Sequence, residues 1–199
     1  MSKVLVINAN AKNAKESRTL ALTELFVNEY KKNNPGDQVE YLNLYEEDMR
    51  FLDESLLGDI AAGKDTVAKF HATKFSGYDK YIYSTPMWNL GAPAIMKAYM
   101  DYVMYTGITF KYTESGAVGL LNDKPRKAIN IVSRGGAYEE EPMKSIEFGT
   151  SYLKAVSHFM GIAQFDTLAF EMTNVLVGED FDKALKIAED KAIEQAKSF

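Results

Sequence analysis

The chain has 199 residues, a net charge of −5, 46% hydrophobic and 26% charged residues, which predicts one globular domain spanning residues 1–199. It has no cysteine and only two histidines, so disulfides, thiolate chemistry and cysteine-ligated metals are excluded, and no metal site is expected. The acidic balance argues against a nucleic-acid partner. The lack of a signal-like or membrane-spanning apolar run predicts a cytoplasmic protein with no membrane partner.

Short apolar runs along the chain predict five β-strands. They are Val4–Asn8, Val39–Leu44, Lys80–Ser84, Ala128–Ser133 and Phe165–Phe170. The first, third and fourth are almost continuously apolar, which is typical of strands covered on both faces in a parallel sheet.

Helical patterns separate the strands. They cover Thr19–Lys32, Leu56–Phe75 (interrupted by glycines, so that two pieces are possible), Ala92–Tyr105, Lys144–Met160 and Asp182–Lys197. The alternation predicts an α/β fold, a flavodoxin-like five-stranded parallel sheet of order 2-1-3-4-5 with helices on both faces. Between the third and fourth strands, Gly107–Lys127 forms a long connection of the kind that often serves function.

Ligands of such sheets bind beyond the carboxyl ends of the strands, so the loops that follow them are the candidate site. After the first strand, Ser17, Arg18 and Thr19 open a helix whose free amides favour an anion such as phosphate. The alternative is that Ser17 is only an N-cap. Neither GxxxxGK[ST] nor GxGxxG occurs, which argues against ATP hydrolysis and dinucleotide binding of the common type.

Two further loops supply other parts of a ligand site. After the third strand, an apolar wall with one polar edge is expected from Met87, Trp88, Asn89 and Leu90. After the fourth, a glycine turn lets the backbone approach a ligand at Ser133, Arg134, Gly135 and Gly136. The alternatives are that Trp88 caps the core and that the glycines make an ordinary turn. Together, the three loops fit FMN.

The segments PMWN, TGITFKYTESGAVGLL and VSRGG, in this order and spacing, resemble the family of FMN-dependent NADH-azoreductases and NAD(P)H:quinone oxidoreductases. The resemblance runs from the first strand to about Phe170. It implies FMN as the cofactor, with the phosphate at Asn10, Ser17, Arg18 and Thr19, and the isoalloxazine ring between the PMWN and SRGG segments. Asn10, Trp88 and Leu90 differ from the residues usual in that family, which bears on substrate preference rather than on the cofactor.

The resemblance also implies a homodimer, in which Phe159 is contributed by the partner subunit and Tyr112 belongs to the substrate pocket. The implied activity is reduction of quinones and azo compounds by NADH or NADPH in a two-electron ping-pong reaction, with the flavin carrying the chemistry and no catalytic side chain required. Two alternatives are a flavodoxin-type electron carrier and a flavin-free α/β interaction domain.

Overall fold

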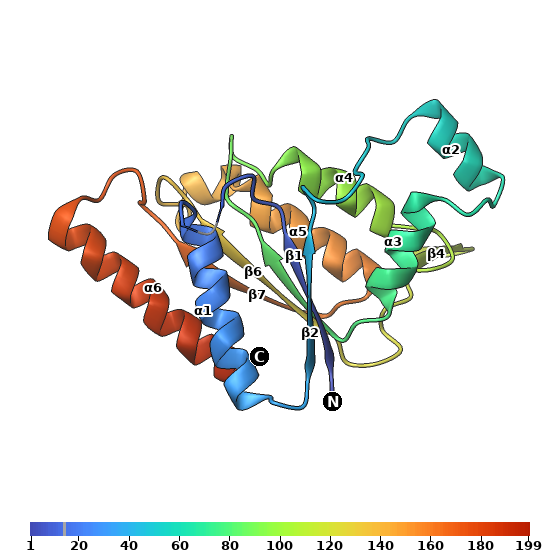
Figure 1. Cartoon of the computed structure of the whole chain (residues 1–199). Coiled ribbons are helices and arrows are strands. Elements are labelled where there is room, and N and C mark those ends of the chain that lie inside the picture. Colours follow the sequence, from blue (N-terminus) through green and yellow to red (C-terminus); the bar gives the residue numbers. More distant parts are fainter. Residues whose placement is uncertain (14) are drawn as a thin grey trace.

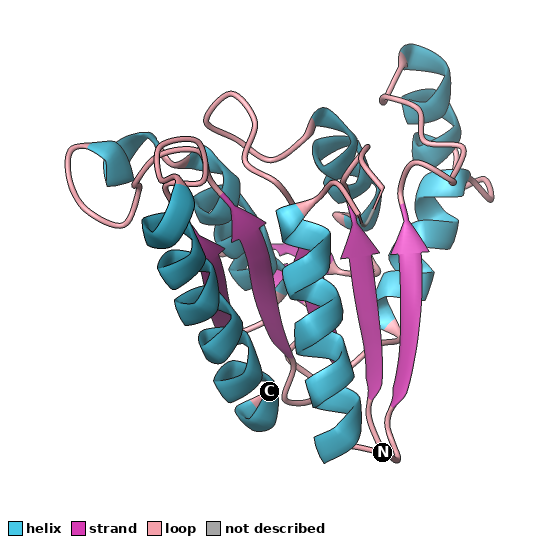
Figure 2. Ribbon diagram, turned by 60° about the vertical axis from the view of Figure 1, so that its left-hand side comes forward, coloured by secondary structure: helices cyan, strands magenta, loops and turns pink. Residues whose placement is uncertain are grey.

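The computed structural model describes residues 1–13 and 15–199, and at its centre is a five-stranded sheet of order β2-β1-β3-β6-β7. All neighbouring strands are parallel, and the arrowheads lie at one edge of the sheet, with both chain ends at the opposite edge (Figure 2). The predicted order 2-1-3-4-5 is therefore confirmed. The strands are β1 (Lys3–Asn8), β2 (Gln38–Asn43), β3 (Lys80–Ser84), β6 (Lys127–Ser133) and β7 (Gln164–Phe170).

Burial of the strands follows their place in the sheet. The central strands β1, β3 and β6 are buried on both faces, whereas the edge strands are largely exposed and bury only Leu42 in β2 and Leu168 and Phe170 in β7. The near-continuous apolar runs in the sequence are therefore the strands that helices cover on both sides.

Helices cover the two faces of the sheet (Figure 1). On one face lie α1 (Arg18–Asn33) and α6 (Gly178–Ser198), which contribute Phe26, Tyr30 and an alanine stripe to one core. That stripe, at positions 188, 192 and 196, is fully buried or nearly so, and its small side chains let α6 approach the sheet closely. The opposite core contains residues of α3 (Val67–Ser76), α4 (Ala94–Val103) and α5 (Phe148–Met160).

Two predicted helices are divided in the structure. The pattern over 56–75 forms α2 (Glu54–Ala61) and α3, with Gly63 at φ +69° in the break. No residue of α2 is buried, and the helix stands away from the body of the molecule (Figure 1). The pattern over 144–160 begins as a 3-10 turn (Met143–Ile146), and α5 starts only after Glu147, whose carboxylate caps it by accepting from the amides of Thr150 and Ser151.

The long connection after α4 contains a β-hairpin that the sequence analysis did not predict. It is formed by β4 (Phe110–Thr113) and β5 (Gly116–Gly119), paired antiparallel. A Cβ at Gly119 would lie 2.4 Å from the backbone carbon of Met160, so glycine is required for the hairpin to rest against the end of α5. No helix in the described ranges combines the length and apolar character needed to span a bilayer.

The core around α3 holds a buried histidine, and we expect it to make stability depend on pH. His71 is only 2% exposed, its ring stacks on Tyr102 at 5.9 Å, and its Nδ1 atom has no hydrogen-bond partner among the described residues. Burial lowers the pKa of His71 below its ordinary value, although Glu47 at 4.0 Å acts in the opposite direction.

Because the folded-state pKa is depressed, the unfolded chain binds this proton first as the pH falls below about 6.5, and folding stability then decreases. Urea unfolding of His71→Phe between pH 7 and pH 5 is expected to show a weaker loss of stability than the unmodified protein. His158→Gln, at the exposed histidine, is the matched control for removal of an imidazole. An identical pH profile in His71→Phe would contradict the prediction.

Candidate functional site

A cavity of about 190 Å³ lies at the carboxyl edge of the sheet, where the loops after β1, β3, β6 and β7 meet. The three loops singled out from the sequence are thus brought together around one space. The cavity is lined by Asn10, Lys12, Glu16, Ser17, Arg18, Pro86, Met87, Trp88, Ser133, Gly135, Thr173 and Asn174.

One wall of the cavity is the N-terminus of α1. Ser17 is the N-cap, and its hydroxyl accepts from the amide of Leu20 at 3.1 Å and from Asn10 Nδ2 at 2.6 Å. With both acceptor positions used, the hydroxyl hydrogen is left to donate to a ligand. The amides of Arg18 and Thr19 have no acceptor within the helix because they belong to its first turn. Ser17 therefore caps the helix and also faces the cavity.

Thr19 takes a different position from the other predicted phosphate ligands. Its side chain is completely buried and does not line the cavity. Its hydroxyl lies 2.7 Å from Ser133 Oγ and accepts from the Ser133 amide at 3.3 Å. Thr19 thus joins the start of α1 to the end of β6 and holds Ser133 at the cavity wall.

The charges around this end of the cavity favour an anion. Lys12 and Arg18 line it together with one acid, Glu16, and the partial positive charge of the α1 N-terminus adds to them. Two cations, unused helix amides and a hydroxyl donor form a donor set suited to a phosphate group.

Another wall of the cavity is a tight turn that carries Trp88. The amide of Trp88 donates to the Gly91 carbonyl at 2.9 Å, and the Gly91 amide returns a bond at 3.0 Å. Asn89 and Leu90 both have positive φ, +49° and +69°, which is the pattern of a type I′ turn. Leucine rarely adopts this conformation, so the turn is strained, and such strain is concentrated at functional sites.

The turn determines the position of Trp88. Trp88 is 39% exposed and is not part of either hydrophobic core, which favours the cavity wall over the alternative that it caps the core. Met87 lines the cavity beside it, and the Met87 amide donates to the Ser133 carbonyl at 3.1 Å. Asn89 and Leu90 form the turn itself and do not line the cavity.

The SRGG turn, residues 133–136, places backbone groups at the cavity, whereas its arginine side chain points into the protein interior. Arg134 is 4% exposed, and its guanidinium binds Glu171 at 2.9 Å and the Thr150 hydroxyl at 2.8 Å. The Arg134 amide donates to the Phe170 carbonyl at 2.8 Å. In the described part of the chain the amides of Gly135 and Gly136 donate no hydrogen bond. Of the two, Gly135 lines the cavity and can offer its amide to a ligand, whereas Gly136 does not line it.

The loop after β7 completes the cavity with Thr173 and Asn174, which the sequence analysis missed. The same rule that selected the other loops, carboxyl ends of parallel strands, also applies to this strand and would have found them. A Cβ at Gly135 would lie 2.6 Å from Asn174 Nδ2, so a larger residue there would displace the Asn174 side chain from its place in the cavity wall. Lys12, Glu16 and Pro86 are further lining residues that were not predicted.

Tyr112 and Phe159, predicted for the substrate pocket, both contact Phe110 and do not line this cavity. The ring of Phe110 lies between them, with its centroid 5.6 Å from that of Tyr112 and 5.1 Å from that of Phe159. Phe159 is near the end of α5, whereas Phe148 at its start donates its amide to the Leu90 carbonyl of the Trp88 turn. At 1.5 Å per residue, Phe159 is about 16 Å further along the helix axis.

Comparison with known proteins places these features in context. A family model described as a flavodoxin-like fold matches residues 2–196. The chain is 47% identical to an FMN-dependent NADH:quinone oxidoreductase of Clostridium perfringens and 44% identical to one of Caldicellulosiruptor saccharolyticus, with complete coverage of both chains in each case.

Solved structures agree with these relatives. An azoreductase from Bacillus anthracis superposes with a TM-score of 0.89 at 30% identity, and each chain is covered completely. An FMN-dependent NADH-azoreductase from the same species, solved in complex with FMN, superposes with a TM-score of 0.85 at 26% identity over 98% of each chain.

Proposed function

Because the chain belongs to the flavodoxin-like family of FMN-dependent NADH:quinone oxidoreductases, we propose that residues 1–199 form one FMN-binding domain and that the cavity at the sheet edge holds the phosphate end of the cofactor. The protein is an FMN-dependent enzyme that uses NADH to reduce quinones and azo compounds. The observation that carries the site assignment is the meeting of an anion-binding helix N-terminus, an exposed Trp88 wall and the unused Gly135 amide around one cavity.

The donor set of the cavity fits FMN. Ser17 and the first amides of α1 bind the phosphate, with Lys12 and Arg18 balancing its charge. Asn10 holds the Ser17 hydroxyl in place, and this role replaces a direct phosphate contact. Thr19 likewise holds the Ser133 hydroxyl in place instead of contacting the phosphate.

Other residues orient the ring system. Met87 and Trp88 provide the apolar wall, and the Gly135 amide would donate to the polar edge of the ring. When bound, FMN supplies the redox chemistry by taking a hydride from the nicotinamide and delivering two electrons to the acceptor. The protein itself binds the cofactor, orients it and tunes its reactivity. The residues that line the cavity include no histidine or cysteine.

The electron-carrier alternative finds no support, because the full-length relatives are oxidoreductases. The cavity also has two cations rather than the acidic surround expected of such carriers. NADH is the nucleotide named in the relatives, and we propose the cytoplasm, where NADH is supplied, as the compartment.

The function is tested by following the fluorescence of Trp88 while FMN is added to the apoprotein. Trp88 is the only tryptophan, so quenching reports on this residue alone. We expect strong quenching at saturation and NADH oxidation that is stimulated by a quinone. Trp88→Tyr should remain folded and bind FMN, with altered relative rates for quinones and azo dyes. Fluorescence indifferent to FMN, together with unchanged acceptor rates, would refute the assignment of the Trp88 wall.

A homodimer is part of the proposal, since one chain leaves Tyr112 and Phe159 far from the cavity. Phe159 is 41% exposed and Phe148 57% exposed, so α5 offers apolar surface to a second copy. Sedimentation at micromolar concentration is expected to give twice the chain mass of 22.3 kDa. Phe159→Asp should shift the protein toward the monomer and lower quinone reduction more than FMN content. A 22.3 kDa species in the unmodified protein would contradict this.

A further inference from the structure

The four residues that follow β7, at positions 171–174, form a clamp on the turn that contains Gly135. Three amides of this β7 clamp each donate to one carbonyl of residues 134–136. The donor and acceptor pairs are Thr173 with Arg134 at 3.1 Å, Asn174 with Gly135 at 3.2 Å, and Met172 with Gly136 at 3.1 Å. The Thr173 hydroxyl adds a second bond to the Arg134 carbonyl at 3.0 Å. This order of partners differs from the register of the β6–β7 ladder, so the clamp is not an extension of that ladder.

The clamp fixes the direction of the backbone amides in the turn. In a planar trans peptide, the carbonyl of one residue and the N–H of the next point in opposite directions. The peptide between Arg134 and Gly135 is trans, so the two bonds from Thr173 to the Arg134 carbonyl also fix the orientation of the Gly135 N–H. Gly135 lines the cavity, and its amide donates no hydrogen bond among the described residues. The clamp therefore orients the amide that this turn offers to the cavity.

The β7 clamp depends on one residue with an unusual backbone conformation. Met172 has a φ of +59°, in the left-handed region that residues other than glycine rarely adopt. A left-handed residue in a turn lets successive amides point to the same side, as the amides of residues 172–174 do. The Met172 side chain is half-buried and does not line the cavity. Any effect of Met172 on a ligand must therefore pass through the backbone of the clamp.

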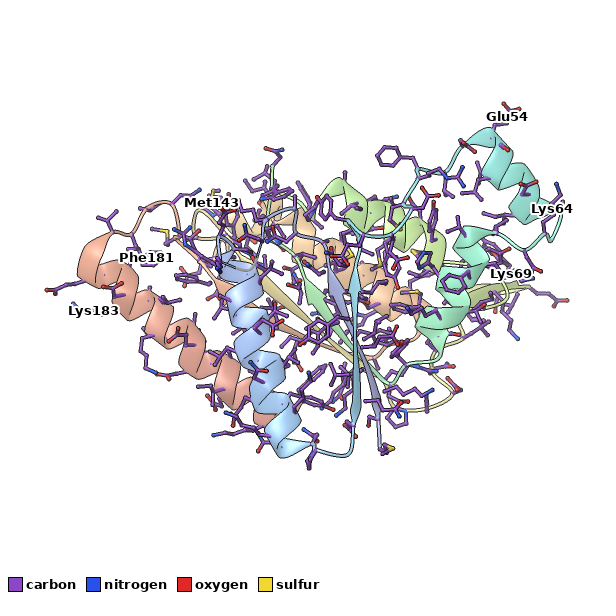
Figure 3. All side chains as sticks on the ribbon, in the orientation of Figure 1. Glu54, Lys64, Lys69, Met143, Phe181 and Lys183 are labelled. Atoms are coloured by element: carbon purple, nitrogen blue, oxygen red, sulfur yellow. The ribbon has the colours of Figure 1, made fainter. Side chains whose placement is uncertain are left out.

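Contacts at both ends of the loop hold this strained conformation. Glu171 binds the Arg134 guanidinium at 2.9 Å. Phe170 ends β7, and the centroid of its ring lies 5.5 Å from that of Phe181 in the first turn of α6. Figure 3 shows Phe181 on the side of α6 that faces α1, whereas Lys183 points away from it. A segment fixed at both ends retains an unfavourable φ because the surrounding contacts over-determine it.

We propose that Met172 is a positioning residue for the flavin. Its left-handed backbone maintains the β7 clamp, which directs the Gly135 amide at the polar edge of the ring and so raises the reduction potential of bound FMN. This inference rests on the proposed function, because it requires the ring to lie beside Gly135. A donor at that edge binds the electron-rich reduced ring more strongly than the oxidised ring, and hydrogen bonds to the ring tune the potential of a flavin.

Two substitutions at Met172 distinguish a backbone role from a packing role. Valine keeps an apolar side chain but strongly disfavours a positive φ, whereas glycine removes the side chain and adopts that φ freely. Before FMN is added, hydrogen exchange at the amides of Thr173 and Asn174 is expected to become about tenfold faster in Met172→Val. In Met172→Gly it should stay close to that of the unmodified protein. If Met172 acted through side-chain packing, glycine would be the more damaging change.

The midpoint potential of bound FMN is the second measurement. Met172→Val is expected to weaken reduced FMN about tenfold more than oxidised FMN, as for the loss of one hydrogen bond, which lowers the two-electron potential by about 30 mV. Met172→Gly should keep the potential. Met143→Val makes the same change at an exposed methionine without a positive φ and outside the cavity. This matched control should alter neither measurement. If Met172→Val does not fold, Thr173→Val, which loses the hydroxyl bond, should lower the potential, and Thr173→Ser should retain it.

Two results would overturn the inference. In the first, Met172→Val leaves the exchange of the clamp amides unchanged, or Met172→Gly accelerates it at least as much, so that the left-handed backbone is not what maintains the clamp. In the second, exchange accelerates in Met172→Val but the FMN potential remains that of the unmodified protein, so that the clamp does not position the flavin. Failure of the unmodified apoprotein to bind FMN would refute the proposed function itself, and this inference with it.

Discussion

Replacing Arg134 by methionine is expected to lower the free energy of unfolding by about 3–5 kcal/mol, because the change leaves buried carboxylates without their cation. Arg134 Nη1 lies 2.9 Å from Glu171 Oε1, and Nη2 lies 3.5 Å from Glu147 Oε1. All three side chains are largely buried, so water does not screen the uncompensated charges. Urea unfolding of the apoprotein measures the loss, and the melting temperature should fall by about 6–20 °C.

Three variants define the cause. Arg134→Lys keeps the charge but loses the planar fork, so an intermediate loss is expected. Glu171→Gln, added to Arg134→Met, removes one unpaired charge and should restore part of the stability. Lys186→Met breaks an exposed pair with Asp190 and should cost no more than about 1 kcal/mol. If Arg134→Met costs no more than Lys186→Met, the buried network does not stabilise the fold as described.

The same network bears on the cofactor site. Glu171 Oε1 also accepts from the amide of Tyr138 at 2.9 Å, and Arg134 Nη2 binds Thr150 in the first turn of α5. Arg134 is therefore a positioning residue for the Gly135-Gly136 turn that follows it in sequence. Arg134→Lys, which should still fold, is expected to weaken FMN binding through misplaced amides.

How far the sequence predicts the fold depends on the range of the interactions that decide each element. The strands are predicted to within one residue at each end because burial on both faces leaves a local apolar run, as in β1 and β3. The β4–β5 hairpin escapes this rule. Its residues are mostly exposed, and what holds Gly119 in place is the backbone of Met160, about 40 residues away, a contact that no local pattern encodes.

The site shows the same division. The carboxyl-end rule locates the loops around Ser17, Trp88 and Gly135, because parallel strands bring their ends to one edge. The rule does not give the direction of a side chain. Arg134 follows a strand as the other candidates do, yet its side chain points inward because it forms ion pairs with Glu171 and Glu147. Both partners come from distant segments of the sequence. Only the tertiary structure distinguishes a residue that contacts the ligand from a residue that holds such a contact in position.

Substitutions at Ser17 are expected to separate phosphate binding from helix capping. Ser17→Ala should weaken FMN roughly 10- to 150-fold, since a hydrogen bond to a charged group contributes about 1.5–3 kcal/mol. The same variant should also lose about 1 kcal/mol of folding stability, because the hydroxyl accepts from the Leu20 amide at 3.1 Å. Flavin titration and urea unfolding of one preparation measure the two effects independently.

Ser17→Asp is expected to give the largest loss of affinity with no loss of stability. Aspartate is a good N-cap and its charge suits the helix dipole, so the apoprotein should be at least as stable as the unmodified chain. Its carboxylate faces the cavity, and unit charges 4 Å apart at an effective dielectric constant of about 20 repel by about 4 kcal/mol, roughly a 1,000-fold loss of FMN affinity.

Ser17→Asn is the neutral control for that charge. It caps nearly as well as aspartate without repelling the phosphate, so its FMN affinity should lie well above that of Ser17→Asp while its stability matches. Riboflavin, which has no phosphate, extends the control, because its affinity should be almost the same in Ser17→Asn and Ser17→Asp. If Ser17→Asp binds FMN as tightly as Ser17→Asn, the phosphate is not at the α1 N-terminus. Ser17 is then a helix cap alone, and Lys12 and Arg18 line the cavity for some other anion.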